Sequence, residues 1–280
     1  MKPIAWLGFD AAFMLLWLLL VGPPAAAVAW AISHTPLPVW ATAALVPLWY
    51  LAFLLGLIAM IRLVRALVPR LEPGTYPFPD SAMARAWLVH FALQRIANMP
   101  LWAPFLFGFA SLRWLVLTAR GARAAFAMQS ANDAEVVDAP MVELGQGCML
   151  AAGTLIAGHL IEHDQLFLAR VTVGPGAQIM GQTTLAPGVT VGRDAVVGPG
   201  AALLPGVDVG EDAYVGLGCM IHNGVRIGPS AVVGHHAIVE ADVVLEEGTT
   251  VAPGARVPRG TTVPAGTAWP PRNHTTKETA

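Results

Sequence analysis

A short polar segment, residues 158–165, has the sequence GHLIEHDQ and contains the side chains best suited to chemistry. It brings His159, Glu162, His163 and Asp164 together within six residues. A histidine beside a carboxylate can act as a general base, because the carboxylate fixes the imidazole tautomer and stabilises the imidazolium that forms. The glycine at its start would let another backbone approach closely. The segment therefore predicts acid–base chemistry, with a solvated surface loop as the alternative.

Two other histidine-containing positions are weaker candidates. His222 with Asn223, and the pair His235 and His236, fall at turn positions of a regular repeat, where polar side chains are expected at the surface. A structural role is therefore the favoured interpretation for both. The substrate-binding candidates that we retain are Gly158, His163, Asp164, Arg170, His222 and Asn223.

The repeat that must position these residues has a strict period of six. An aliphatic residue recurs at every sixth position from Val173 to Val263, Phe167 stands one period earlier, and a small or β-branched residue comes four places after each. A helical face would recur every three to four residues, whereas short strands joined by tight turns can recur every six. This periodicity is typical of a parallel β-helix.

The polar segment interrupts the repeat. Leu144, Leu150 and Ile156 are six apart, but Phe167 comes eleven residues after Ile156, so we expect five surplus residues to bulge from the coil. Three hexapeptides before the bulge and seventeen after it predict six to seven coils, or roughly 30 Å of stacked strands.

Two long apolar segments precede the repeat. Residues 11–32 and 39–61 are each long enough to cross a hydrocarbon core, which needs about 20 helical residues. A signal peptide is the alternative for the first, but a second span follows after only six residues, which favours a transmembrane hairpin. Lys2 and three arginines at 62, 65 and 70 flank the pair, so the positive-inside rule places both ends, and the β-helix, in the cytoplasm.

The region between hairpin and repeat predicts helices at the membrane surface. A proline-rich connector at 71–80 leads into an amphipathic helix at 83–99, followed by an apolar stretch to Leu117 that Arg113 interrupts. A third span is the alternative for this stretch, although a buried arginine there would be costly. The expected organisation is transmembrane helices at 1–70, linker and interfacial helices at 71–131, β-helix at 132–267 and a disordered tail at 268–280.

The charge distribution and the cysteine positions limit which partners and cofactors we expect. Residues 1–131 have a formal charge of +6 and the remainder −8, which makes nucleic acid an improbable partner of the acidic half. Only 12% of residues are charged, as in membrane proteins. Cys148 and Cys219 occupy small inward positions of the repeat, so we expect packing rather than a disulfide or a metal site.

The repeat resembles a known superfamily. Val191, Val197 and Val209 are each followed by glycine, as in the hexapeptide-repeat, or isoleucine-patch, acyltransferases. This resemblance implies a left-handed parallel β-helix, usually a trimer with active sites between subunits. It also implies transfer of an acyl group from a thioester to an amine or hydroxyl, assisted by a histidine base in a loop leaving the helix.

The order of segments along the whole chain resembles a more specific group of proteins. The paired spans, the PGTYP linker, SLRWLVLTARGAR and GHLIE are similar to one membrane-bound module of the carboxy-terminal region of poly-lysine-synthetase-type nonribosomal peptide synthetases. Such modules are proposed to join aminoacyl units. The resemblance implies that His159 is the catalytic histidine and Glu162 its acidic partner.

The leading hypothesis is therefore a multi-pass acyl or aminoacyl transferase of a bacterial inner membrane. Its co-substrate would be acyl-CoA or a phosphopantetheine-carrier thioester, its partners membrane lipid, two further copies in a homotrimer and a peptide synthetase or carrier protein, and no metal is expected. A γ-type carbonic anhydrase with interfacial zinc is one alternative. A non-catalytic β-helix scaffold for peptide-synthetase or polysaccharide assembly is the other.

Overall fold

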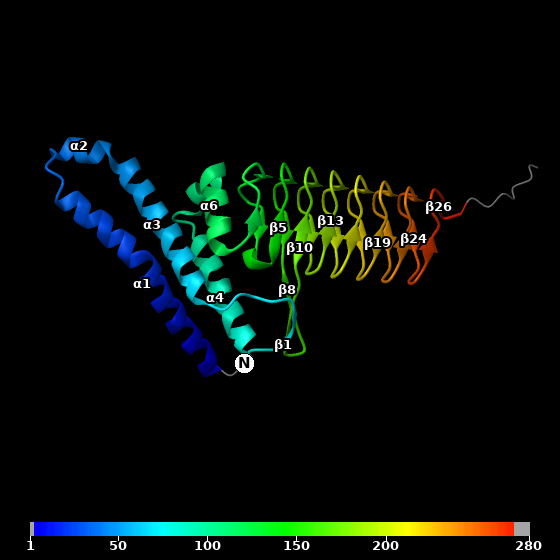
Figure 1. Cartoon of the computed structure of the whole chain (residues 1–280), viewed down its shortest axis with the longest axis horizontal. Coiled ribbons are helices and arrows are strands. Elements are labelled where there is room, and N and C mark those ends of the chain that lie inside the picture. The colour runs from blue at the N-terminus through cyan, green and yellow to red at the C-terminus, as the bar shows by residue number, and fades with distance from the viewer. Residues whose placement is uncertain (1–2, 272–280) are drawn as a thin grey trace, which may run out of the picture. The chain divides into compact units, whose positions relative to one another are not determined.

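The computed structural model describes residues 3–271, and of residues 3–9 the backbone alone. Two compact units share the chain (Figure 1). The first comprises Met1–Arg70 and Ala86–Gly121, and the second comprises Leu71–Arg85 and Ala122–Ala280.

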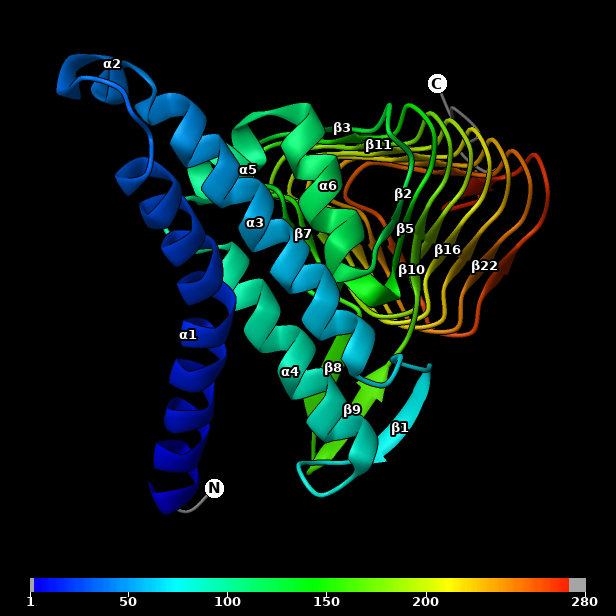
Figure 2. The same cartoon turned by 60° about the vertical axis from the view of Figure 1, so that its left-hand side comes forward.

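The first unit contains a helical hairpin. Helix α1 (Pro3–Ser33) runs unbroken through Pro23 and Pro24 and lies beside α3 (Val46–Leu67) (Figure 2). Asp10–Ser33 and Val46–Leu67 are long and apolar enough to cross a membrane by length and composition. This confirms two apolar helices, whereas their insertion in a membrane stays a prediction.

The second apolar helix begins later than expected. A short helix, α2 (Val39–Ala44), ends before α3 starts, so the apolar segment predicted at 39–61 is divided. Proline stands in the first turn of α3, where its missing N–H costs no helical hydrogen bond but stops α2 from running on.

Three more helices follow. Helix α4 (Ala82–Ala97) confirms the predicted amphipathic helix, and the next apolar stretch is divided at Phe109 into α5 (Ala103–Gly108) and α6 (Ala110–Arg120). At about 1.5 Å per residue, α6 is roughly 16 Å long, too short for a third span. Arg113 is buried and donates from Nε to the Phe107 carbonyl at 2.8 Å, which satisfies a carbonyl at the end of α5.

The second unit is a parallel β-solenoid built from three sheets (Figure 1). The first sheet contains β2 (Arg123–Ala124), β5 (Val142–Leu144), β10 (Val171–Val173), β13 (Thr190–Val191), β16 (Asp208–Val209), β19 (Arg226–Ile227), β22 (Val244–Leu245) and β25 (Thr262–Val263). The second contains β3 (Gln129–Ser130), β6 (Met149–Leu150), β11 (Gln178–Ile179), β14 (Val196–Val197), β17 (Tyr214–Val215), β20 (Val232–Val233), β23 (Thr250–Val251) and β26 (Ala268–Trp269). The third contains β4 (Glu135–Val136), β7 (Leu155–Ile156), β12 (Thr184–Leu185), β15 (Ala202–Leu203), β18 (Met220–Ile221), β21 (Ile238–Val239) and β24 (Arg256–Val257).

Each complete coil contributes one strand to each sheet, the last coil contributes β25 and β26 alone, and the repeat residues form the core. In β13, Val191 points inward and is buried while Thr190 is exposed, and the N–H of Thr190 donates to the Val207 carbonyl of the next coil at 2.9 Å. Parallel register stacks Val173, Val191 and Val209 on one another. The period of six thus correctly predicted the inward residues of this part of the chain.

The solenoid is longer than predicted at both ends. Strands β2, β3 and β4 add a first coil, so it begins near Arg123 rather than at residue 132 and has about eight turns. This coil lacks the aliphatic–glycine pattern and is held by pairing with the next. At the other end, β26 pairs with β23, so Ala268 and Trp269 belong to the solenoid and not to the tail. Residues 272–280 of the predicted disordered tail lie outside the described residues.

The interruption is a β-hairpin of eleven surplus residues rather than a bulge of five. Val173 follows Ile156 in the coil after seventeen residues instead of six. Strands β8 (His159–Glu162) and β9 (Gln165–Leu168) pair antiparallel, and β1 (Gly74–Pro77), from the predicted linker, pairs with β9 (Figure 2). Phe167 therefore pairs with Leu160 and Thr75 instead of opening the repeat.

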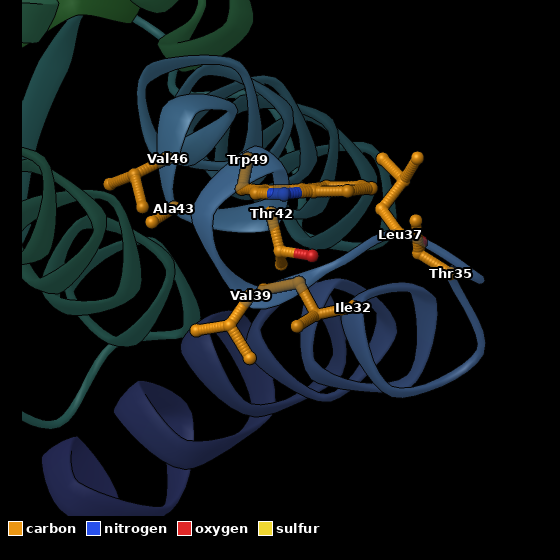
Figure 3. A pocket seen from close by; sticks show the side chains of 8 residues that line it. All are labelled: Ile32, Thr35, Leu37, Val39, Thr42, Ala43, Val46 and Trp49. Atoms are coloured by element: carbon orange, nitrogen blue, oxygen red, sulfur yellow. The ribbon is translucent and has the colours of Figure 1, made fainter.

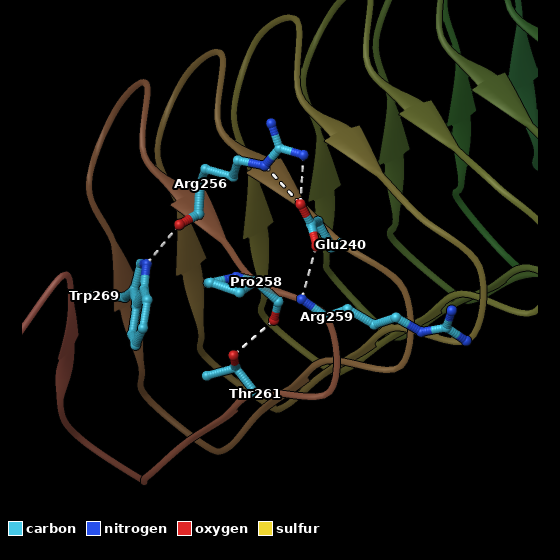
Figure 4. A network of polar contacts seen from close by, with 6 residues as sticks. All are labelled: Glu240, Arg256, Pro258, Arg259, Thr261 and Trp269. Carbon is cyan, nitrogen blue, oxygen red and sulfur yellow. Dashed lines mark hydrogen bonds and ion pairs between the residues drawn. The ribbon is translucent and has the colours of Figure 1, made fainter.

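A polar network covers the last coils of the solenoid (Figure 4). The Glu240 carboxylate accepts hydrogen bonds from Arg256 Nε at 2.6 Å and from the backbone N–H of Arg259 at 2.9 Å. Trp269 stands in the last inward position, and its indole Nε1 donates to the Arg256 carbonyl at 2.9 Å. These bonds occupy backbone groups on β24 and its turn, at the open end of the third sheet.

We expect Glu240 to stabilise the solenoid only above acidic pH. The Arg259 N–H and then the Arg256 side chain lower the pKa of Glu240 below its ordinary 4.5, so its contribution is complete above that value and is lost as pH falls through the lowered folded-state pKa. At pH 7 the Glu240→Gln variant should melt about 1–3 °C below the wild type, as for an exposed ion pair. Circular dichroism melts from pH 7 to pH 3 should show this gap closing, and a gap independent of pH would contradict it.

Candidate active site

His159 has an acidic partner, but it is one distant in the sequence. His159 opens β8 with its side chain about 20% exposed, and its Nδ1 lies 2.6 Å from Oδ2 of the buried Asp138. With Asp138 ionised, its carboxylate can only accept hydrogen bonds, so Nδ1 would donate to it and Nε2 would be the basic nitrogen of a neutral imidazole. This is the arrangement of a general base whose imidazolium form the carboxylate stabilises.

Local structure holds both side chains in place. Asp138 precedes a single 3-10 turn, η1 (Ala139–Met141), and its Oδ2 also accepts the Gly158 N–H at 2.9 Å. A Cβ on Gly158 would lie 2.5 Å from the Met141 Cβ and 3.2 Å from the Asp138 Cβ. Gly158 therefore allows the close approach that the sequence suggested, and the group that approaches is the Asp138 turn.

Glu162 lies elsewhere on the hairpin. It ends β8, and its carboxylate is 3.5 Å from Nδ1 of His163, with both side chains largely exposed. Residues three apart in a strand point to opposite faces, so His159 and Glu162 diverge. His163 and Asp164 form the turn, with φ of 47° and 56°, as a type I′ turn requires. The acid beside the His159 ring is thus Asp138.

Counting one coil of eighteen residues back from Gly158 leads to Pro140, two residues from Asp138. Val136 and Ile156 are register partners in β4 and β7, so the residues two places on, Asp138 and Gly158, occupy the same corner of successive coils. The signal was missed because the repeat was taken to begin later and the first coil has no aliphatic–glycine pattern.

Arg170, another predicted substrate-binding residue, forms a hydrogen bond to the coil beside the hairpin. Arg170 Nη1 donates to Glu143 Oε1 at 2.9 Å. His222 and Asn223 follow β18 at the same corner as His159 but three coils beyond β7, about 14 Å away at the usual strand spacing. Within one chain, they are not brought to the His159 site.

Within residues 3–271, no three His, Cys, Asp or Glu side chains are grouped so as to hold a metal ion. The expectation that no metal is used stays a prediction.

An apolar pocket in the helical unit is a separate feature (Figure 3). It has a volume of about 450 Å³ and lies where α1 ends and α2 and α3 begin, with Trp49 along one side. Thr35 and Thr42 are its polar lining residues, and their hydroxyls donate to carbonyls of their own helical turns. It contains no acid or base and so does not compete with His159 as a site of proton transfer.

Both cysteines are buried packing residues, as predicted. Cys148 and Cys219 are free thiols with at most 1% exposure. Burial raises the pKa of Cys148 to about 11 and also raises that of Cys219. The thiolate is the reactive form of cysteine.

Neither thiol should therefore react in the folded protein. At pH 8 only about one Cys148 in a thousand is ionised if its pKa is about 11, and both sulfurs are shielded. Mass spectrometry after iodoacetamide treatment should find no label in native protein and two labels in denaturant. Stoichiometric labelling of the native protein would contradict the buried placement.

Comparison with known proteins finds a family match for the middle of the chain. The bacterial transferase hexapeptide family (six repeats) matches residues 170–205, the coils directly after the hairpin. No curated protein matches the chain. The similarity to a peptide-synthetase module therefore stays a prediction.

Solved structures similar to the chain include the following three proteins. A hexapeptide transferase family protein from Anaplasma phagocytophilum is 21% identical over 53% of this chain and 72% of that one, with a TM-score of 0.31. UDP-N-acetylglucosamine acyltransferase from Francisella novicida is 12% identical over 53% and 60%, with a TM-score of 0.37. PerB from Caulobacter crescentus, in complex with CoA and GDP-perosamine, is 21% identical over 59% and 70%, with a TM-score of 0.30.

Proposed function

We propose that the protein is a membrane-anchored acyltransferase that moves an acyl or aminoacyl group from a thioester to an amine or hydroxyl. The observation that carries this proposal is the 2.6 Å contact between Asp138 and His159 on a hairpin that leaves a hexapeptide solenoid. A general base at such a position can activate a neutral nucleophile. The family match to residues 170–205 favours transfer over other uses of a base.

In the proposed reaction, His159 Nε2 takes the proton from the acceptor N–H or O–H while the acceptor atom bonds to the thioester carbonyl carbon. The resulting oxyanion then expels the thiolate as the C–S bond breaks, and the imidazolium returns its proton to that sulfur. Asp138 stabilises the imidazolium between these steps, a role that we assign to it in place of Glu162. The Gly158 N–H already binds Asp138, so the oxyanion needs another donor, which a turn of a neighbouring protomer would supply.

The remaining parts of the proposal concern location and assembly. The hairpin of α1 and α3 would span a bacterial inner membrane, with the solenoid in the cytoplasm because Arg62 and Arg65 lie in the last turns of α3 and Arg70 follows it. The solenoid would be left-handed and trimeric. The donor would be acyl-CoA or a carrier-bound phosphopantetheine thioester, and a peptide synthetase or carrier protein would be the source of the latter.

Acceptor-dependent release of free thiol tests the activity. Full-length protein in detergent would be given acetyl-CoA or an aminoacyl-pantetheine thioester with a panel of amines and alcohols, and thiol release and acylated product would be measured together. We expect equal amounts of both. Absence of product with every pair would favour the scaffold alternative, and zinc-dependent hydration of carbon dioxide would favour the carbonic anhydrase alternative.

A further inference from the structure

Two arginines share one carboxylate next to the hairpin that carries His159. Glu143 Oε1 accepts from Arg123 Nη1 at 2.7 Å and from Arg170 Nη1 at 2.9 Å. Arg123 and Glu143 are register partners on β2 and β5, whose inward neighbours form the core, so both side chains lie on the outer face of the first sheet. The three groups together have a charge of +1. We name Arg123, Glu143 and Arg170 the arginine pair site.

The cluster is arranged to hold an anion rather than to neutralise one charge. A guanidinium has five N–H donors, and each of these bonds uses one of them. The Arg123 side chain is 71% exposed and that of Arg170 33% exposed, so the remaining donors can reach a ligand. Glu143, at 29% exposure, holds both guanidinium groups at one point. Paired guanidinium groups match the planar oxygens of a carboxylate or a phosphate.

Short segments connect this site to the catalytic pair on both sides. Arg170 follows Leu168 by two residues, and Leu168 is the register partner of His159. Partner Cα atoms in an antiparallel pair are about 5 Å apart and two residues span at most about 7 Å, so the His159 and Arg170 Cα atoms are at most roughly 12 Å apart. Glu143 in turn follows Asp138 by five residues, with the single turn η1 between them. The arginine pair site is therefore within reach of a substrate held at His159.

The short span favours the acceptor over the donor as the ligand of this site. Thirteen bonds separate the sulfur of phosphopantetheine from its phosphorus, about 16 Å when extended at the rise of an extended chain. An extended donor whose sulfur lies at His159 would carry its phosphate past the Arg170 Cα, so this phosphate would meet the guanidinium groups only with a bent chain or an outstretched arginine. A small acceptor with its nucleophile and its anionic group only a few bonds apart fits the shorter span.

We infer that the acyl acceptor is an anion, a small amine or alcohol that carries a carboxylate or phosphate group, and that Arg123 and Arg170 bind this group. The inference rests on the proposed transfer for the role of the ligand. The anion site itself does not depend on it, because its geometry involves no reaction. Guanidinium groups bind carboxylate and phosphate oxygens in the same way. The experiment below shows which of the two anions the site binds.

The first test measures anion binding without catalysis. Full-length protein in detergent would be melted with 50 mM sodium phosphate, 50 mM sodium acetate or sodium chloride at matched ionic strength, since a ligand that binds the folded state raises the melting temperature. We expect a rise with phosphate or with acetate, and the more effective anion identifies the class. The rise should disappear in Arg123→Gln and Arg170→Gln and persist in Arg226→Gln, an outward arginine on β19 of the same sheet.

The His159→Ala variant separates this inference from the proposed function, because it should lose transfer and keep the anion-dependent rise. The inference is overturned if no anion raises the melting temperature of the wild type, or if Arg170→Gln keeps the full rise. In the transfer assay, Arg170→Gln should raise KM at least tenfold for anionic acceptors and leave KM for acetyl-CoA unchanged. A raised KM for acetyl-CoA alone would assign the arginines to the donor and overturn the inference.

Discussion

Replacing His159 with alanine should lower kcat for acyl transfer by about 10²- to 10⁴-fold, the usual contribution of a positioned general base. The acceptor N–H or O–H would have no base within reach, whereas the surfaces that bind donor and acceptor would remain. KM should therefore change little. The measurement is acceptor-dependent thiol release with full-length protein at saturating donor.

His163→Asn is the matched control for this variant, because asparagine tolerates the positive φ of this turn position. His163 lies on the same hairpin, four residues away, with its side chain 89% exposed in the turn. It should leave kcat within about twofold, because surface substitutions of this kind rarely perturb a fold or a site. If His159→Ala retained wild-type activity while its solenoid stayed folded, the assignment of the base would fail.

Replacing Asp138 with asparagine should lower kcat by about 10- to 100-fold. The amide oxygen can still accept from Nδ1 and from the Gly158 N–H, so the change removes mainly the charge that stabilises the imidazolium. A hydrogen bond to a charged group is worth about 1.5–3 kcal/mol, and each 1.4 kcal/mol corresponds to a factor of ten. The loss should appear in kcat rather than KM, because Asp138 is buried and acts through His159.

Glu162→Gln decides between the two acids. Glu162 is exposed and its carboxylate lies 3.5 Å from His163 Nδ1, so we expect kcat within about twofold of the wild type. A larger loss from Glu162→Gln than from Asp138→Asn would restore Glu162 as the orienting acid. Circular dichroism melts of both variants would show whether a lowered rate reflects loss of the solenoid.

Local pattern was sufficient for much of the architecture. The period of six from Val173 to Val263 placed an inward side chain in every strand, because strand alternation and turn length act within one hexapeptide. The same holds for the two apolar helices, whose length and composition are local properties. His159 could also be singled out, since a histidine in a break of a regular repeat is visible without any fold.

Pattern failed where pairing between distant segments decides the structure. Phe167 lies one period before Val173 and so imitates a repeat position, yet antiparallel pairing with Leu160 and Thr75 places it in the hairpin sheet. Strand β1 was not predicted in the proline-rich linker, because it forms by pairing with the distant strand β9. The first coil, from Arg123 to Val136, has few repeat residues and takes its register from the coil that stacks on it.

Residue spacing and composition were enough to predict a hexapeptide β-solenoid, a pair of apolar helices and a histidine in the break between coils. The acid that serves this histidine became apparent from contacts between coils. Asp138 is 21 residues from His159 and meets it because successive coils stack corner on corner, whereas Glu162, three residues away, points to the opposite face of its strand. Proximity in a solenoid follows the number of residues per coil, and the coil from Val136 to Ile156 has twenty residues instead of eighteen because η1 adds two between β4 and β5.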